Sequence, residues 1–130
     1  MKRNPLFFLI CALVLGSCVS AKNISEDLSA EQLIQMGQNM YGNGQYASAA
    51  RYYQVAIERY GTDTRTYIES RYELGNVYLK QKKYQLAYDA FKEIESLYEA
   101  ADAGMLPGAF QKLAKIGLSK IPEKKLKQLQ

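Results

Sequence analysis

The chain has 130 residues, of which 48% are hydrophobic and 23% are charged, and its formal net charge is +4 at pH 7. It contains no histidine, which removes the commonest general base and zinc ligand. Basic and acidic residues number 17 and 13, a balance too even to indicate a nucleic-acid-binding surface. No glycine-rich phosphate loop or paired-carboxylate motif stands out. We therefore expect a protein that is not an enzyme and that binds no cofactor, metal or nucleic acid.

The first 17 residues have the pattern of an export signal. Lys2 and Arg3 precede an apolar run over 6–15, and two small residues then lead to Cys18. A positive start, a short apolar stretch and a small-residue cleavage site are typical of a secretory signal peptide. The run is well short of the ~20 residues that cross a bilayer, so a membrane-spanning helix is not expected here.

The order Leu15-Gly16-Ser17-Cys18 resembles a bacterial lipobox. In that family the chain is cut before the cysteine, whose sulfur carries diacylglycerol and whose new amine is acylated. The resemblance implies that Cys18 is the lipid attachment site, that residues 18–29 hold the lipidated end and a tether, and that the protein lies at the outer membrane facing the periplasm. Cys11 would be removed with the signal, which leaves Cys18 without a disulfide partner. An ordinary secretory signal with a nearby cysteine is the alternative.

Residues 19–28 are polar and lack aromatic side chains, so we expect a tether there rather than part of the fold. Ser29 and Gln32 have the spacing of a capping box, in which each side chain bonds the backbone N–H of the other residue. A first helix is therefore predicted to begin at Ala30 and to end near Tyr41, before a Gly-Asn-Gly turn.

The stretch Tyr46–Tyr60 has the apolar stripe of a second helix, and this stripe is repeated 38 residues later. Its apolar and small side chains recur at the spacing of one helical face. The repeat predicts another helix from Tyr84 to about Glu99. Gly61 is expected to end the second helix as a left-handed cap, and Thr62-Asp63-Thr64 is expected to begin a third.

The third helix is expected to carry Leu74-Gly75 on its apolar side, as the first carries Met36-Gly37. Arg71 and Glu73 are expected to be solvated charges on its outer side. The turn at 80–83 has no glycine, so the sequence leaves its geometry open.

The C-terminal part begins with a predicted loop over 100–106. Pro107 suits a first helical turn, and Phe110, Leu113 and Ile116-Gly117 predict the apolar side of a capping helix at about 107–119. Residues 122–130 are expected to form a short basic tail that frays.

The repeated helices resemble the tetratricopeptide repeat (TPR), whose signature places Leu-Gly, Tyr, Ala and an aromatic residue at fixed intervals. The resemblance implies an all-α fold over residues 30–121. It would be a right-handed α-solenoid of two hairpin repeats, at about 30–63 and 68–101, with a capping helix. The matching residues are Leu33, Met36-Gly37, Met40, Ala49, Tyr53 and Gly61 in the first repeat, and Arg71, Leu74-Gly75, Tyr78, Ala87, Phe91 and Glu99 in the second.

The sequence departs from the TPR signature in three respects. Neither repeat has the closing proline, Arg71 stands where a bulky apolar residue is usual, and the period is 38 rather than about 34 residues. A glycine inside a helix costs about 1 kcal/mol relative to alanine, so its repetition indicates a packing need. Gly37 and Gly75 are expected to let paired helices approach closely, opposite Ala49 and Ala87.

Tyrosine-rich repeats and the helix end Glu58-Arg59-Tyr60, in a short exported lipoprotein, resemble BamD, a family that helps to assemble β-barrels into the outer membrane. The resemblance implies a lipid-anchored envelope adaptor that binds a protein partner, either a peptide or a helix. A cell-wall-associated carbohydrate-binding protein or wall-enzyme accessory is the alternative. In the repeat family the first helix of each pair lines a binding groove, and the implied positions are Glu31, Ile34, Gln38, Tyr41, Glu69, Tyr72, Asn76 and Leu79.

Overall fold

The structure is a computed structural model that describes residues 24–101 and 104–130. These residues form six α-helices and no strand, so the predicted all-α class is confirmed. The four long helices lie close to their predicted positions, because apolar stripes and capping residues mark them in the sequence. The helices are α1 (Ala30–Gly42), α2 (Tyr46–Tyr60), α3 (Thr64–Lys80), α4 (Tyr84–Ala100), α5 (Phe110–Ser119) and α6 (Glu123–Leu129).

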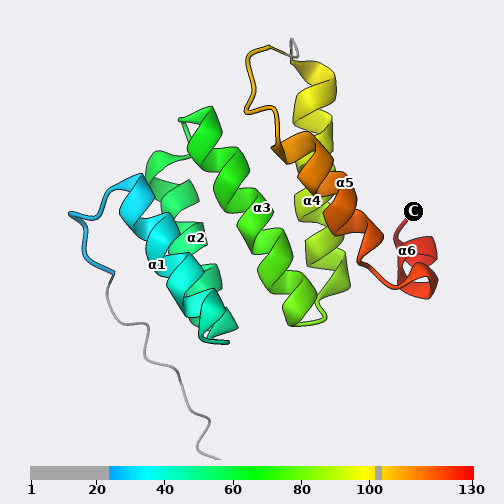
Figure 1. The fold of residues 1–130 in the computed structure, drawn as a ribbon, viewed down its shortest axis with the longest axis horizontal. Coiled ribbons are helices and arrows are strands. Elements are labelled where there is room, and N and C mark those ends of the chain that lie inside the picture. The colour runs from blue at the N-terminus through cyan, green and yellow to red at the C-terminus, as the bar shows by residue number, and fades with distance from the viewer. Residues whose placement is uncertain (1–23, 102–103) are drawn as a thin grey trace, which may run out of the picture.

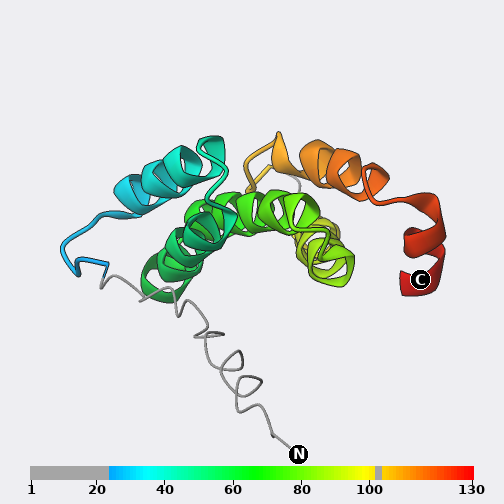
Figure 2. The ribbon, with the colours of Figure 1, turned by 90° about the horizontal axis from the view of Figure 1, so that it is seen from below.

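Each of the helices α1 to α4 packs against the next helix in the chain. In addition, α3 contacts both α1 and α5, so these three helices form a continuous row with α3 in the middle. Figure 1 shows α2 behind α1 and α4 behind α5. Figure 2 shows that the row is bent, with α1 and α5 raised on either side of α3.

Side-chain caps begin α1 and α3 as the sequence predicts. The backbone N–H of Gln32 donates to Ser29 Oγ at 3.3 Å, and the Ser29 N–H donates to Gln32 Oε1 at 2.9 Å. At the start of α3, the Thr66 N–H donates to Asp63 Oδ1 at 2.8 Å. The first turn of a helix has N–H groups with no partner inside the helix, so these bonds satisfy groups that would otherwise need water.

The α1–α2 and α3–α4 turns have the same backbone geometry at positions 38 residues apart. Gly44 has a φ of 73° and Lys82 a φ of 57°, both in the left-handed region. In each turn the backbone N–H of the residue after the left-handed one donates to the carbonyl five residues earlier at 2.9 Å (Gln45 to Met40, Lys83 to Tyr78). This bonding is a Schellman motif, which ends a helix through a left-handed residue. The turn without glycine therefore copies the first turn, with a lysine in the glycine position.

The core has two clusters, one around Leu33, Tyr53 and Leu74 and one around Ile68, Phe91 and Ala114. In both, a helical glycine makes room for an aromatic ring. A Cβ added at Gly37 would lie 2.5 Å from Cε1 of Tyr53, and one added at Gly75 would lie 2.6 Å from Cε1 of Phe91. A Cβ at Gly117 of α5 would lie 2.5 Å from Cζ of Phe91, so two glycines border this ring.

Several local predictions were wrong. The side chains nearest to the glycines are the aromatic rings rather than Ala49 and Ala87. Gly61 ends α2 with a φ of −68°, a right-handed conformation. The capping helix begins at Phe110, because residues 107–109 form a turn in which the Phe110 N–H donates to the Pro107 carbonyl at 3.3 Å.

The segment after Pro122 forms a helix instead of a frayed tail. It packs against α4, and Leu126 contacts the second core cluster. Ile121, just before this helix, is 3% exposed. The folded domain therefore extends beyond residue 121 to Leu129.

Residues 24–28 also pack onto the fold, although the sequence predicts a tether there. The Arg59 guanidinium donates to the Ser25 carbonyl at 2.6 Å and to the Ile24 carbonyl at 3.0 Å. The Tyr60 hydroxyl donates to the Leu28 carbonyl at 2.7 Å. Ile24 and Leu28 pack against the first core cluster. The predicted signal over 1–17 and the lipidated Cys18 lie outside the described residues.

Candidate functional site

Polar side chains from α1 and α3 gather where these two helices meet. Gln38 Nε2 donates to Glu73 Oε1 at 3.3 Å, which joins the two helices directly. Residues three or four apart share one side of a helix, so Tyr41 lies beside Gln38, and Glu69 and Asn76 lie on either side of Glu73. We call the surface formed by Gln38, Tyr41, Glu69, Glu73 and Asn76 the α1–α3 face.

Glu73 lies at the centre of the α1–α3 face and is not the solvated charge that the sequence predicts. It is half-buried, and this burial raises the pKa of its carboxyl above the usual value. Hydrogen bonds from the side chains of Gln38 and Asn76 oppose the rise, and the negative charge of Glu69 adds to it. The prediction failed because Gln38 is 35 residues away in the sequence, on another helix.

Arg71, also expected to be solvated, forms a partly buried ion pair with Glu93 of α4, with Nε and Oε2 at 2.6 Å. The Tyr67 hydroxyl donates to the same carboxylate. Burial is the larger cause that raises the pKa of this tyrosine, and the hydrogen bond to Glu93 is the next. These contacts join α3 to α4 on the side away from Gln38. Arg71 therefore has a structural partner and is not the solvated charge that the sequence predicts.

The charge of Glu73 contributes to raising the pKa of two tyrosines. The pKa of Tyr41 is raised first by burial and then by Tyr46, Glu73 and Tyr72. The pKa of Tyr53 is raised first by burial and then by Glu73, Tyr41 and Glu69. Tyr53 comes from α2 and is 0% exposed, and none of the described residues forms a hydrogen bond with its hydroxyl. The sequence pattern places Tyr53 in the apolar stripe of α2, and that pattern does not indicate that carboxylates would influence its hydroxyl.

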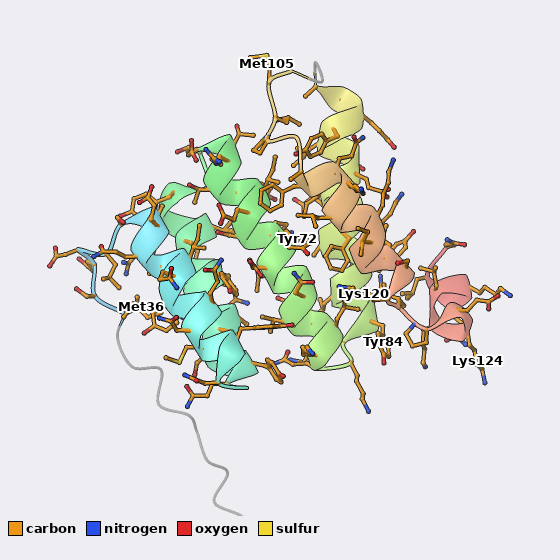
Figure 3. The ribbon with its side chains drawn as sticks, in the orientation of Figure 1. Met36, Tyr72, Tyr84, Met105, Lys120 and Lys124 are labelled. Carbon is orange, nitrogen blue, oxygen red and sulfur yellow. The ribbon has the colours of Figure 1, made fainter. Side chains whose placement is uncertain are left out.

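Tyr72 and Leu79 line the side of α3 that faces α4 and α5. The Tyr72 ring centroid lies 6.0 Å from that of Phe91 and 5.6 Å from that of Phe110, the latter in an edge-on arrangement. Figure 3 shows Tyr72 projecting between α3 and α5. Leu79 packs against the second core cluster. Both are partly exposed, so they provide an apolar border to the α1–α3 face.

The other two predicted groove residues do not lie on this face. Ile34 is 7% exposed and belongs to the first core cluster, so its side chain is not free to contact a partner. Glu31 is exposed in the first turn of α1, where Ser29 Oγ donates to its Oε2 at 2.9 Å. Bonds to its own backbone N–H and to Ser29 lower the pKa of Glu31, which indicates a role in capping the helix.

The chemistry of the α1–α3 face suits recognition by hydrogen bonds and charge. It offers carboxylate, amide and hydroxyl oxygens as acceptors, with aromatic rings beside them. Across residues 24–101 and 104–130, no three His, Cys, Asp or Glu side chains come together as a metal site would require. An open depression of about 480 Å³ lies elsewhere, beside the α2–α3 turn at Thr62–Arg65 and near Met105 and Pro107, and none of the predicted site residues lines it.

No helix within the described ranges is both long and apolar enough to cross a bilayer. No protein-family model matches the chain, and no solved structure matches it. A curated protein of Treponema pallidum (strain Nichols), described as uncharacterized, is 30% identical to it over 124 residues. The match covers 93% of this chain and 50% of the relative, so the chain spans about half the length of the curated protein that it matches.

Proposed function

We propose that this protein is a lipid-anchored adaptor of the bacterial cell envelope that binds a protein partner on the α1–α3 face. The observation that carries this proposal is the gathering of Gln38, Tyr41, Glu69, Glu73 and Asn76 from two successive hairpins, beside the partly exposed Tyr72. Polar groups that fix the register of a bound segment, next to aromatic groups that supply contact area, are typical of protein interfaces.

We further propose that the helices are TPR-like repeats in a right-handed solenoid and that the bent row α1–α3–α5 forms the binding groove. Two observations support a structural repeat. The turns at Gly44 and Lys82 share one Schellman geometry, and the Gly37–Tyr53 and Gly75–Phe91 contacts recur at the same 38-residue spacing. A BamD-like role would make the partner a component of outer-membrane protein assembly.

The proposed anchor is Cys18, with lipid attached to its sulfur. Residues 24–28 are held by Arg59 and Tyr60, so the tether would comprise only residues 18–23 and would reach roughly 20 Å when extended. The partner surface would then work close to the membrane. Labelled palmitate should enter the wild-type chain and should not enter Cys18→Ser. Equal incorporation into both would refute the anchor.

A pull-down from detergent-solubilised envelopes tests the adaptor role. Gln38→Ala/Asn76→Ala removes two amides of the α1–α3 face. It leaves the aromatic core intact, whereas truncating Tyr72 would open that core. The matched control, Gln54→Ala/Gln85→Ala, removes two amides from α2 and α4. The wild type and the control should recover the same partner, and the face variant should lose it while unfolding at the same temperature. Full recovery by a folded face variant would contradict the proposal.

A further inference from the structure

Glu69 and Glu73 carry negative charge on the α1–α3 face with no cation beside them. They lie one helical turn apart on α3, and like charges at that spacing repel one another. The ion pairs in the described ranges involve other carboxylates, those of Glu58, Glu93, Glu95 and Glu123. Within the part of the chain that the structure describes, neither Glu69 nor Glu73 has an ion-pair partner.

The environment of Glu73 makes this lack of a cation costly. Its side chain is half-buried, and Gln38 supplies a neutral hydrogen bond at 3.3 Å rather than a positive charge. A carboxylate that is partly withdrawn from water regains stability when a cation reaches it. The free protein therefore presents an unbalanced negative charge at a surface position.

Tyr53 provides a second, independent observation at the same place. Its side chain is fully buried, and its hydroxyl has no hydrogen-bond partner among residues 24–101 and 104–130, although buried polar groups are nearly always hydrogen-bonded. A Cβ at Gly37 would lie 2.7 Å from the Tyr53 Cζ atom that carries this hydroxyl, and the next residue is Gln38, which binds Glu73. Phe91 fills the equivalent position 38 residues later, so packing there does not require a hydroxyl.

We propose that the Glu69–Glu73 pair, together with Gln38 and Tyr41, binds the side chain of a lysine or arginine projecting from the partner segment on the α1–α3 face. This inference rests on the proposed function and specifies the chemistry of the partner. An arginine or lysine head donates several N–H bonds, and the face offers carboxylate, amide and hydroxyl oxygens to accept them. The apolar stem of such a side chain can lie along the tyrosine rings.

Matched peptides test the charge requirement on the full chain in detergent. The probes are a fluorescent acetyl-Ala-Leu-Arg-Leu-Ala-amide and its twin with citrulline, a neutral isostere, in place of arginine. The arginine peptide should bind the wild type at least fivefold more tightly than the citrulline peptide. Glu69→Gln/Glu73→Gln should abolish this difference. The control Glu58→Gln/Glu99→Gln, which loses the same charge from α2 and α4, should keep it.

Several outcomes would overturn the inference. Equal affinity of the two peptides for the wild type would do so, as would a preference that survives in the folded Gln variant. If the wild type self-associated and the Gln variant did not, the two carboxylates would instead bind lysines of a second copy of the chain. Glutamine keeps the shape of glutamate, and circular dichroism checks that each variant is folded.

The envelope pull-down separates failure of this inference from failure of the proposed function. Loss of the partner in Gln38→Ala/Asn76→Ala but not in Glu69→Gln/Glu73→Gln would overturn the cation site and leave the adaptor role standing. Retention of the partner by both folded variants would remove the α1–α3 face from the proposed function as well. Loss in both is the result that we expect.

Discussion

Replacing Gly75 by alanine tests the packing of α3 against α4 within the second hairpin. The added Cβ would lie 2.6 Å from Cε1 and 2.7 Å from Cζ of Phe91, whereas carbon atoms in contact normally lie about 3.5–4.0 Å apart. The ring has little room to retreat, because a Cβ at Gly117 would lie 2.5 Å from the same Cζ. One side chain or helix must therefore move by about 1 Å.

Two opposing effects set the size of the change. Forcing an extra methyl group into a packed core costs about 1–3 kcal/mol. Alanine inside a helix gains about 1 kcal/mol over glycine. Since Phe91 is bordered by two helices, we expect the cost at the upper end of its range and a net loss of about 1–2 kcal/mol. A loss of 1 kcal/mol lowers the melting temperature of a domain of this size by about 4–8 °C.

Gly42 provides the matched control, because it also lies in a helix and nothing lies within 4 Å of an added Cβ. Gly42→Ala should leave stability unchanged or raise it by up to about 1 kcal/mol. Urea unfolding followed by helical circular dichroism measures both variants. If Gly75→Ala were as stable as Gly42→Ala, the close contact between Gly75 and Phe91 would be refuted.

Two further predictions concern the core and the second turn. Phe91→Ala should cost about 3–5 kcal/mol, because the ring is fully buried, whereas Lys92→Ala on the surface should change stability by less than about 0.5 kcal/mol. Similar melting of these two variants would contradict the register of α4. Lys82→Gly should raise the free energy of unfolding by about 1 kcal/mol, because a φ of 57° is strained for lysine. Lys83→Gly should not raise the free energy of unfolding, because Lys83 has a φ of −86°. If both variants changed the melting temperature equally, the left-handed conformation of Lys82 would be contradicted.

The helices of this protein were largely predictable because each carries its own local signal. The apolar stripe of α2 recurs in α4, and the side chains of Ser29 and Asp63 mark the starts of α1 and α3. α6 was missed because it is seven residues long and has no side-chain cap, and its position depends on burial of Ile121 against distant helices. Local patterns therefore predicted the elements but not every contact that stabilises them.

The candidate site was only partly predictable, since it depends on pairs that are far apart in the sequence. Helical spacing brought Gln38, Glu69 and Asn76 to one face, but it also selected Ile34, which packs in the core. It missed Glu73, whose hydrogen bond crosses from α3 to α1. The spacing between Glu69 and Glu73 was the available signal, because a residue four positions from a face residue shares that face.

The most direct test of a protein partner on the α1–α3 face is site-specific photo-cross-linking of the full chain in its native cells. A photoreactive side chain at Asn76 should give one discrete adduct with a second protein. The same group at Gln85, an exposed position on α4, should not. The adduct should disappear when Glu69→Gln/Glu73→Gln is introduced alongside the photoreactive group. Absence of any adduct at Asn76, or an identical adduct from Gln85, would contradict a partner bound on this face.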